Sequence, residues 1–150
     1  INASFWDNVM EPDGKGGLAL RLGFRQLRGM KQEETDWIVA ARGNGYLDVE
    51  DIWRRAGAGP RTLAKLAEAD AFAALSLDRR GALWAARAVS NDSPLPLFAG
   101  DIDGEGIVEP AVQFREMGEG EHVVEDYVSL RLTLRSHPMA LLRHVLTPAA

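Results

Sequence analysis

Residues 63–88, LAKLAEADAFAALSLDRRGALWAARA, constrain the fold of this chain more than any other stretch. Leu63, Leu66 and Ala67 recur at helical spacing, which predicts one apolar face of a helix. This helical pattern meets a second one at a tight apolar corner, residues 69–72. The stretch therefore predicts two short helices that pack against each other around a sharp turn.

A similar corner occurs earlier, at residues 27–31, where Gly29 separates a short apolar pattern from a helical one. Two such corners in one small helical unit are typical of a paired helix-hairpin-helix module. Such a module usually binds the backbone of nucleic acids. We expect a mainly α fold: a tandem helix-hairpin-helix, SAM-like bundle with an N-terminal β-hairpin, followed by an acidic C-terminal linker and a helix.

The helices of this unit carry local start signals. Asp48 and Asp78 each precede a helical pattern, where an aspartate side chain caps the first turn. Pro60 fits the first position of a helix. Residues 31–42 are expected to form a helix with a buried stripe that includes Trp37 and Ile38. Large aromatic side chains at apolar-stripe positions are expected in the core, which applies to at least three of the four tryptophans, Trp6, Trp37, Trp53 and Trp84.

The two ends of the chain differ from this body. Apolar and polar side chains alternate in residues 4–11 and 18–24, and a Pro-Asp-Gly turn lies between the two runs. This pattern predicts a β-hairpin. Residues 91–121 are rich in Gly, Pro and acidic side chains and have too little apolar surface to order independently. Apolar residues then return, which predicts a helix over about residues 122–134 and leaves open a second one after Pro138.

The net charge of −5 hides a segregation of charge along the chain. Residues 15–91 carry 13 Lys and Arg against nine Asp and Glu, whereas residues 92–126 carry ten acids and one Arg. A basic body with an acidic tail fits a nucleic-acid-binding unit, although an ordinary solvated surface has a similar balance.

The first corner has the chemistry of a phosphate-binding turn. A tight turn before a helix directs unpaired N–H groups to one spot, and the helix dipole favours an anion there. Gly29 permits the close approach, Met30 and Lys31 follow it, and Arg25, Arg28 and Lys31 add positive charge. Such contacts do not distinguish bases, so binding is expected to be independent of DNA sequence and sensitive to salt. The alternative is a plain helix–helix turn with Gly29 as a cap.

The second corner is a poorer phosphate site. Asp70 lies where the turn would carry a glycine, and its carboxylate repels phosphate, so a structural role is favoured there. Arg79 and Arg80 follow the corner and are candidate DNA-backbone contacts, with a solvated helix start as the alternative.

Other chemistry is weakly supported by the sequence. The three histidines lack the spacing of metal ligands, and the acidic residues form no acid–base pair. The chain has no Cys, which excludes disulfides and thiolate metal sites. It has no run of 18 apolar residues that would span a membrane. We therefore predict no metal, cofactor or catalytic residue in this chain.

Several stretches together resemble one family of proteins. SFWDNVME, LALRLGFRQLRGM, LAKLAEADAFAALSLDRRGALWAARA, LPLFA and VVEDYVSLRLTLRSHPMALLR occur here in the order expected of bacterial C-family DNA polymerases. The chain is most similar to the error-prone, second DnaE type, also called ImuC, a relative of the DNA polymerase III alpha subunit. The resemblance covers nearly the whole chain, and the chain begins in mid-pattern, as expected of a segment of a longer protein.

The resemblance implies a cytoplasmic bacterial DNA polymerase, dependent on Mg²⁺ and used in damage-induced translesion synthesis with accessory partners. It implies four regions here: residues 1–26 as a β-hairpin at the edge of the fingers, 27–90 as the tandem helix-hairpin-helix domain, 91–121 as a linker, and 122–150 as a connection towards an OB-like domain. The catalytic aspartates of the family lie upstream, so the implied role here is non-catalytic binding of primer–template duplex DNA.

Comparison with the family pattern also marks departures. Gly29 matches the glycine of the first hairpin, whereas Lys31 and Asp70 replace glycines. Leu95, Leu97 and Phe98 stand where the replicative relative carries its sliding-clamp motif, but the leading Gln is missing. The alternative function is therefore a protein-interaction module that recruits a sliding clamp or accessory proteins, and these residues equally fit a linker that packs on its own domain.

Overall fold

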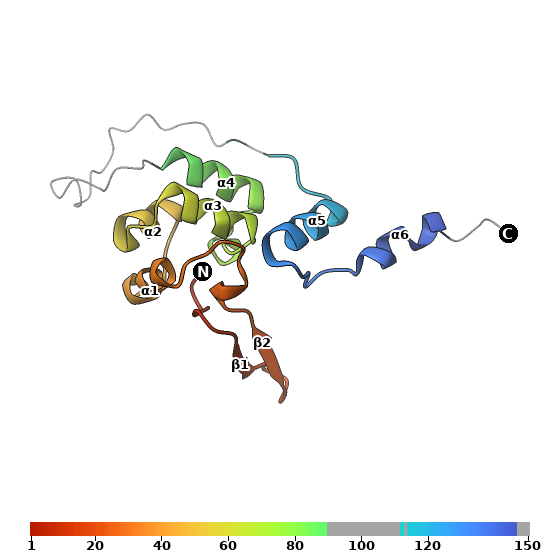
Figure 1. Ribbon diagram of the computed structural model, residues 1–150, viewed down its shortest axis with the longest axis horizontal. Helices are drawn as coiled ribbons and strands as arrows, with labels where there is room; N and C mark the ends of the chain where they lie inside the picture. Colours follow the sequence, from red (N-terminus) through yellow and green to blue (C-terminus); the bar gives the residue numbers. More distant parts are fainter. Residues whose placement is uncertain (90–111, 113, 147–150) are drawn as a thin grey trace.

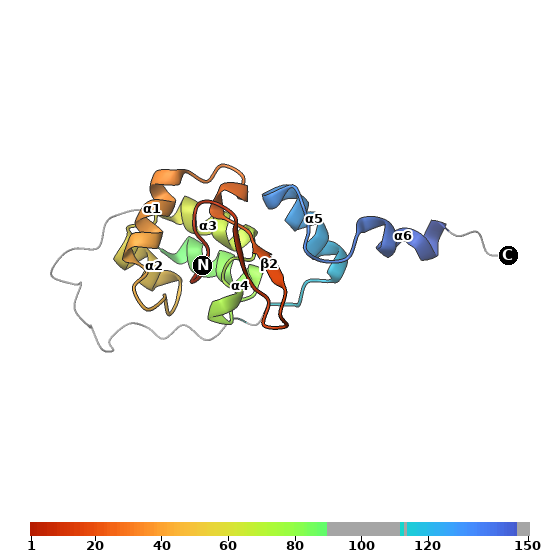
Figure 2. The same cartoon turned by 90° about the horizontal axis from the view of Figure 1, so that it is seen from below.

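The computed structural model describes residues 1–89, 112 and 114–146, which form a helical body with a β-hairpin on one side and two helices on another (Figures 1 and 2). The hairpin consists of β1 (Val9–Pro12) and β2 (Leu18–Arg21). The helices are α1 (Gln32–Ala41), α2 (Val49–Ala56), α3 (Pro60–Glu68), α4 (Arg79–Ala88), α5 (Glu119–Leu130) and α6 (Pro138–Leu146). Short 3₁₀ turns, η1 (Phe24–Gln26) and η2 (Ala73–Leu75), precede α1 and α4. The expected fold class, mainly α with an N-terminal hairpin, is confirmed.

The core lies among the first four helices. Ile38 of α1, Ile52 of α2, and Leu63 and Leu66 of α3 are fully buried. Phe72, directly after the second corner, is equally buried and packs in the same cluster. The apolar faces predicted from helical spacing in α2 and α3 therefore do form the interior.

Local capping signals define where these helices begin. The Asp48 carboxylate accepts the Asp51 amide at 2.7 Å, and the Asp78 carboxylate accepts the Gly81 amide at 2.6 Å. Pro60 occupies the first turn of α3, as expected. These signals operate within four residues, which is why the sequence revealed them.

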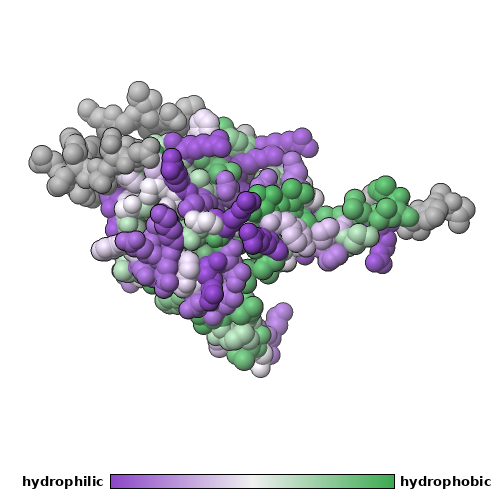
Figure 3. Space-filling model, viewed as in Figure 1, coloured by the Kyte–Doolittle hydropathy of each residue, from purple (hydrophilic) through white to green (hydrophobic). Residues whose placement is uncertain are grey.

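The β-hairpin is shorter than predicted and largely open to solvent. Its strands pair in antiparallel register with Met10 opposite Leu20, and they cover less than residues 4–11 and 18–24. Leu18 and Leu20 are 67% and 57% exposed, because no described segment covers this face. Hydrophobic surface is visible over the hairpin in Figure 3. Gly23 joins the hairpin to the body, and a Cβ at this position would clash with the Trp6 carbonyl oxygen.

Two tryptophans differ from the prediction of buried positions. Trp37 on α1 is 64% exposed and Trp84 on α4 is 51% exposed, whereas Trp6 and Trp53 pack against the core. On α1 the interior is formed by Thr35 and Ile38 instead. The apolar residues of α1 do not lie on a single face, so periodicity alone misplaced Trp37.

Two helices, α5 and α6, follow the helical body towards the C-terminus. α5 begins three residues earlier than the expected residue 122, and it packs against α3. α6 confirms a second helix after Pro138 and extends away from the body (Figures 1 and 2). None of the described helices has the length and apolar character needed to cross a bilayer.

Candidate nucleic-acid interface

The first helix-hairpin-helix turn, residues 27–31, is called the first hairpin below. It has exposed polar residues above two buried apolar side chains. Leu27 and Met30 are 8% exposed each and belong to the core cluster. Arg28, Gly29 and Lys31 lie between and after them and are exposed. Met30 thus supports the turn from beneath, while its neighbours present backbone and charge to solvent.

Gly29 adopts a backbone conformation that side chains disfavour. Its φ is +73°, in the left-handed region, and its N–H has no hydrogen-bond acceptor among the described residues. Lys31 provides no side-chain cap to α1, and the amides of Lys31, Gln32 and Glu33 likewise find no acceptor in this part of the chain. Open N–H groups at a helix N-terminus, next to the positive end of its dipole, form the type of geometry that binds phosphate.

Lys65 of α3 holds this turn from the other side. Its Nζ donates to the Gly29 carbonyl oxygen at 2.6 Å and lies 3.8 Å from the Glu34 carboxylate. Lys65 was not singled out from the sequence, because its partner lies 36 positions away. It fixes the hairpin against the second helical pair and neutralises one of two acidic residues in the first turn of α1, leaving Glu33 exposed.

The amide of Arg28 is already used within the protein. It donates to the Ser129 carbonyl oxygen at 2.8 Å, which joins the C-terminal end of α5 to the hairpin. Figure 2 shows this end of α5 beside the loop that precedes α1. The Arg28 side chain remains exposed and makes no hydrogen bond or ion pair with another described residue. The same holds for the Lys31 side chain within the described ranges.

In the second hairpin, residues 69–72, backbone amides donate to carbonyl groups of the protein itself. The N–H of Asp70 donates to the Ala67 carbonyl and that of Ala71 to the Leu66 carbonyl, both at 3.0 Å. Asp70 has φ +56°, so this is a Schellman-type end of α3 with an aspartate in the position that usually carries glycine. The Asp70 carboxylate also pairs with Arg135 at 3.2 Å. The geometry agrees with the structural role expected from the sequence.

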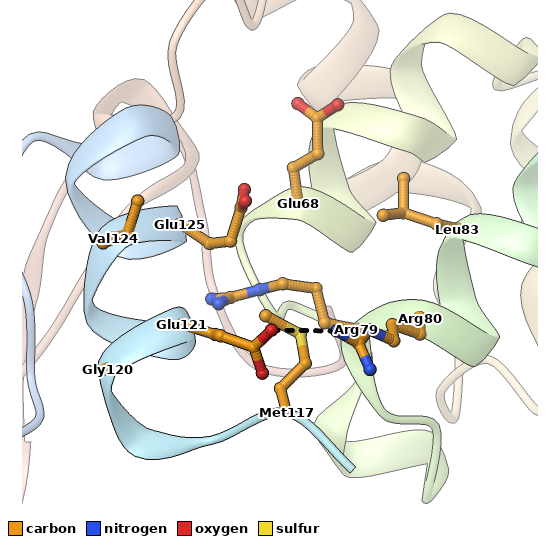
Figure 4. Close-up of a pocket in the computed structure, with 9 residues that line it drawn as sticks. All are labelled: Glu68, Arg79, Arg80, Leu83, Met117, Gly120, Glu121, Val124 and Glu125. Atoms are coloured by element: carbon orange, nitrogen blue, oxygen red, sulfur yellow. Dashed lines mark hydrogen bonds and ion pairs between the residues drawn. The ribbon is translucent and has the colours of Figure 1, made fainter. Parts of the chain in front are cut away.

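The candidate contacts Arg79 and Arg80 both pair with side chains of α5, and of the two only Arg79 is buried. Arg79 is 1% exposed, and its guanidinium donates to the Asp126 carboxylate at 2.6 Å and to the His122 carbonyl at 3.2 Å. Arg80 pairs with Glu121 at 3.2 Å. Both line a cleft of about 520 Å³ between α4 and α5 (Figure 4). The sequence suggested the charges but could not show that the acidic helix α5 binds them.

Two further sets of predicted residues have different positions. Arg25 is exposed but pairs with Asp7 at 2.7 Å, at the margin of the first hairpin. Leu95, Leu97 and Phe98, the candidate protein-binding residues, lie outside the described residues, as does most of the linker 91–121. Within the described ranges, no group of three His, Cys, Asp or Glu side chains is arranged to hold a metal ion.

A glycine-bearing turn with open amides, paired with a second turn in one helical bundle, defines a helix-hairpin-helix protein. A family model described as "Helix-hairpin-helix motif" matches residues 1–82, more than half of the sequence. The chain therefore belongs to the helix-hairpin-helix family.

The names of similar proteins define the class of protein more narrowly. The chain is 59% identical over 143 residues to an error-prone DNA polymerase of Ruegeria pomeroyi, a match that covers 95% of this chain and 13% of that protein. It is 48% identical over 151 residues to error-prone DNA polymerase 2 of Rhizobium meliloti, and 44% identical over 143 residues to an error-prone DNA polymerase of Brucella abortus.

These matches confirm the resemblance seen in the sequence. The chain spans about an eighth of the length of the Ruegeria relative, so the likeness concerns one segment of such polymerases. No solved structure matches the chain significantly.

Proposed function

We propose that this chain is a non-catalytic segment of a bacterial error-prone DNA polymerase that binds the backbone of duplex DNA during damage-induced translesion synthesis. The observation that carries the proposal is the first hairpin, where the Gly29 amide and the first amides of α1 have no acceptor among the described residues. The family match and the names of the relatives support the same function.

The physical argument rests on the match between this turn and a phosphate group. Open N–H groups supply hydrogen bonds that a phosphate oxygen accepts, and Arg28 and Lys31 supply positive charge beside them. The Lys65 side chain fixes the position of the turn through the Gly29 carbonyl. None of these groups distinguishes one base from another, so the segment binds primer–template duplex irrespective of its sequence.

The polymerase reaction itself is assigned to other parts of the parent protein. The resemblance implies catalytic aspartates upstream of this segment, and any Mg²⁺ would act there. In this proposal the segment acts in the bacterial cytoplasm and keeps the duplex in register behind the site of synthesis. Accessory mutagenesis proteins and a sliding clamp remain expectations, because the residues predicted to contact a clamp lie outside the described ranges.

Fluorescence anisotropy of the chain with a random-sequence duplex tests the proposal. We expect affinity to fall as salt rises from about 50 mM to about 200 mM, with the log–log slope reporting the phosphates contacted. The double variant Arg28→Gln, Lys31→Gln removes two charges and should reduce that slope by about 1.8 if each contacts one phosphate.

Arg87→Gln is the matched control. Arg87 is exposed and lies in the last turn of α4, a helix whose C-terminal end is apart from the loop that precedes α1 (Figure 1). Its removal should leave the salt slope unchanged. The proposal fails if the chain binds no duplex at about 50 mM salt, or if the Arg28 and Lys31 double variant behaves like the Arg87 control.

A further inference from the structure

The second hairpin offers no open amide at Asp70 or Ala71 to a phosphate, so only the first hairpin contacts the duplex backbone in this proposal. Paired hairpins are suited to two points on a duplex, but here the Asp70 and Ala71 amides donate to α3 carbonyls. The Asp70 carboxylate is moreover negative and would repel phosphate. A second contact must come from another element.

Residues 129–135 run from one hairpin to the other. At one end, the Ser129 carbonyl accepts the Arg28 amide at 2.8 Å, and at the other, Arg135 pairs with Asp70 at 3.2 Å. Seven residues span at most about 25 Å when fully extended.

Arg131 is the cation of residues 129–135 that has no partner among the described residues. It is exposed, and its guanidinium makes no hydrogen bond or ion pair with any residue that the structure describes. Arg135 is different, because it pairs with both Asp70 and Glu119. Arg131 lies two positions after Ser129, so its backbone is held close to that of Arg28 at the first hairpin.

The backbone of Arg131 also adopts a conformation that favours glycine over arginine. It ends α5 with φ +62°, a left-handed position at which glycine is the usual residue. Packing explains the neighbours, because Ser129 is buried and Leu130 packs against the core, but it does not explain a long charged side chain at this position. A phosphate contact would supply the partner that this guanidinium lacks among the described residues.

We propose that Arg131 is a further phosphate contact of the duplex-binding surface, at the end of α5 beside the first hairpin. The surface then consists of the open amides at Gly29, the charges of Arg28 and Lys31, and Arg131 at the end of α5. This inference rests on the proposed function and assigns a binding residue that the helix-hairpin-helix motif does not contain.

Two substitutions at this position test the proposal in the same anisotropy titration with the full chain. Arg131→Gly removes the charge and relieves the left-handed backbone, so the melting temperature should hold or rise while binding weakens. We expect the dissociation constant to rise about threefold to tenfold and the salt slope to fall by about 0.9. Arg131→Lys retains the charge and should bind within about twofold of the parent chain.

The outcomes separate this proposal from the one on which it rests. If Arg131→Gly keeps the parent affinity and slope while the Arg28 and Lys31 variant loses both, the role of Arg131 is refuted and the first hairpin stands. If Arg131→Lys weakens binding as much as Arg131→Gly, the charge is not responsible and the proposal also fails. Absence of duplex binding by the parent chain refutes the proposed function as well.

Discussion

The Arg28 amide donates to the Ser129 carbonyl oxygen at 2.8 Å, which joins two residues that lie 101 positions apart. Through this bond the C-terminal end of α5 is attached directly to the first hairpin. The attachment brings a helix from the acidic part of the chain onto the basic body. It also means that the proposed binding surface includes residues from both ends of the chain.

The buried ion pair between Arg79 and Asp126 should be the main link between α4 and α5. The Asp126 side chain is 8% exposed and also accepts the Thr133 hydroxyl at 2.7 Å. Asp126→Ala leaves the Arg79 charge buried and unpaired, so we expect a decrease of about 3–5 kcal/mol in the free energy of unfolding, measured with urea. The apolar double variant Arg79→Met, Asp126→Leu should recover most of this decrease, and no recovery would show that the pair itself is required.

The left-handed backbone at Gly29 should matter for both stability and binding. Gly29→Ala places a Cβ 3.8 Å from the Lys65 side chain, an ordinary contact, so the cost comes from the backbone and should be about 1–2 kcal/mol. Gly14 in the β-hairpin turn has the same φ of +73° and open space around it. Gly14→Ala should therefore cost a similar amount of stability but leave duplex binding unchanged, whereas Gly29→Ala should weaken it.

Truncation of two adjacent residues of α1 should change stability by very different amounts. Ile38 is fully buried, so Ile38→Ala should lower the free energy of unfolding by about 2–5 kcal/mol, because apolar packing is removed and a cavity remains. Trp37 is 64% exposed, so Trp37→Ala should change it by no more than about 0.5 kcal/mol. Urea denaturation followed by circular dichroism measures both, and a large destabilisation in the tryptophan variant would contradict its exposed position.

Stability should fall in acid partly because of Asp51. Burial raises the pKa of its carboxyl, but hydrogen bonds from the Arg55 guanidinium and the Leu47 amide, with the charges of Arg55 and Arg54, outweigh this and leave the pKa below its ordinary value. A carboxyl with a lowered folded-state pKa contributes stability above its unfolded pKa of about 3.9, and that contribution disappears as pH falls through the folded value. Asp51→Asn should be less stable at neutral pH, and should lose less stability than the parent chain between about pH 5 and about pH 2.

Features that depend on near neighbours in the chain could be predicted before the fold was known. Asp48 and Asp78 cap their helices, Pro60 starts α3, and Gly29 adopts positive φ, because each effect acts within one helical turn. Helical spacing likewise identified the buried face of α3, and the order of several stretches identified the polymerase relatives. The candidate hairpin followed from the same local signals.

Which charges remain available to a ligand depends on contacts between distant parts of the chain. Arg79 is buried against Asp126, 47 positions away, while Lys65 reaches the Gly29 carbonyl and Arg131 lies beside the first hairpin. The position of Trp37 on the outside of α1 was decided in the same way. The physical reason is that burial and ion pairing depend on how the helices pack, both within the helical body and between this body and α5. This packing joins segments whose separation in sequence carries no local signal.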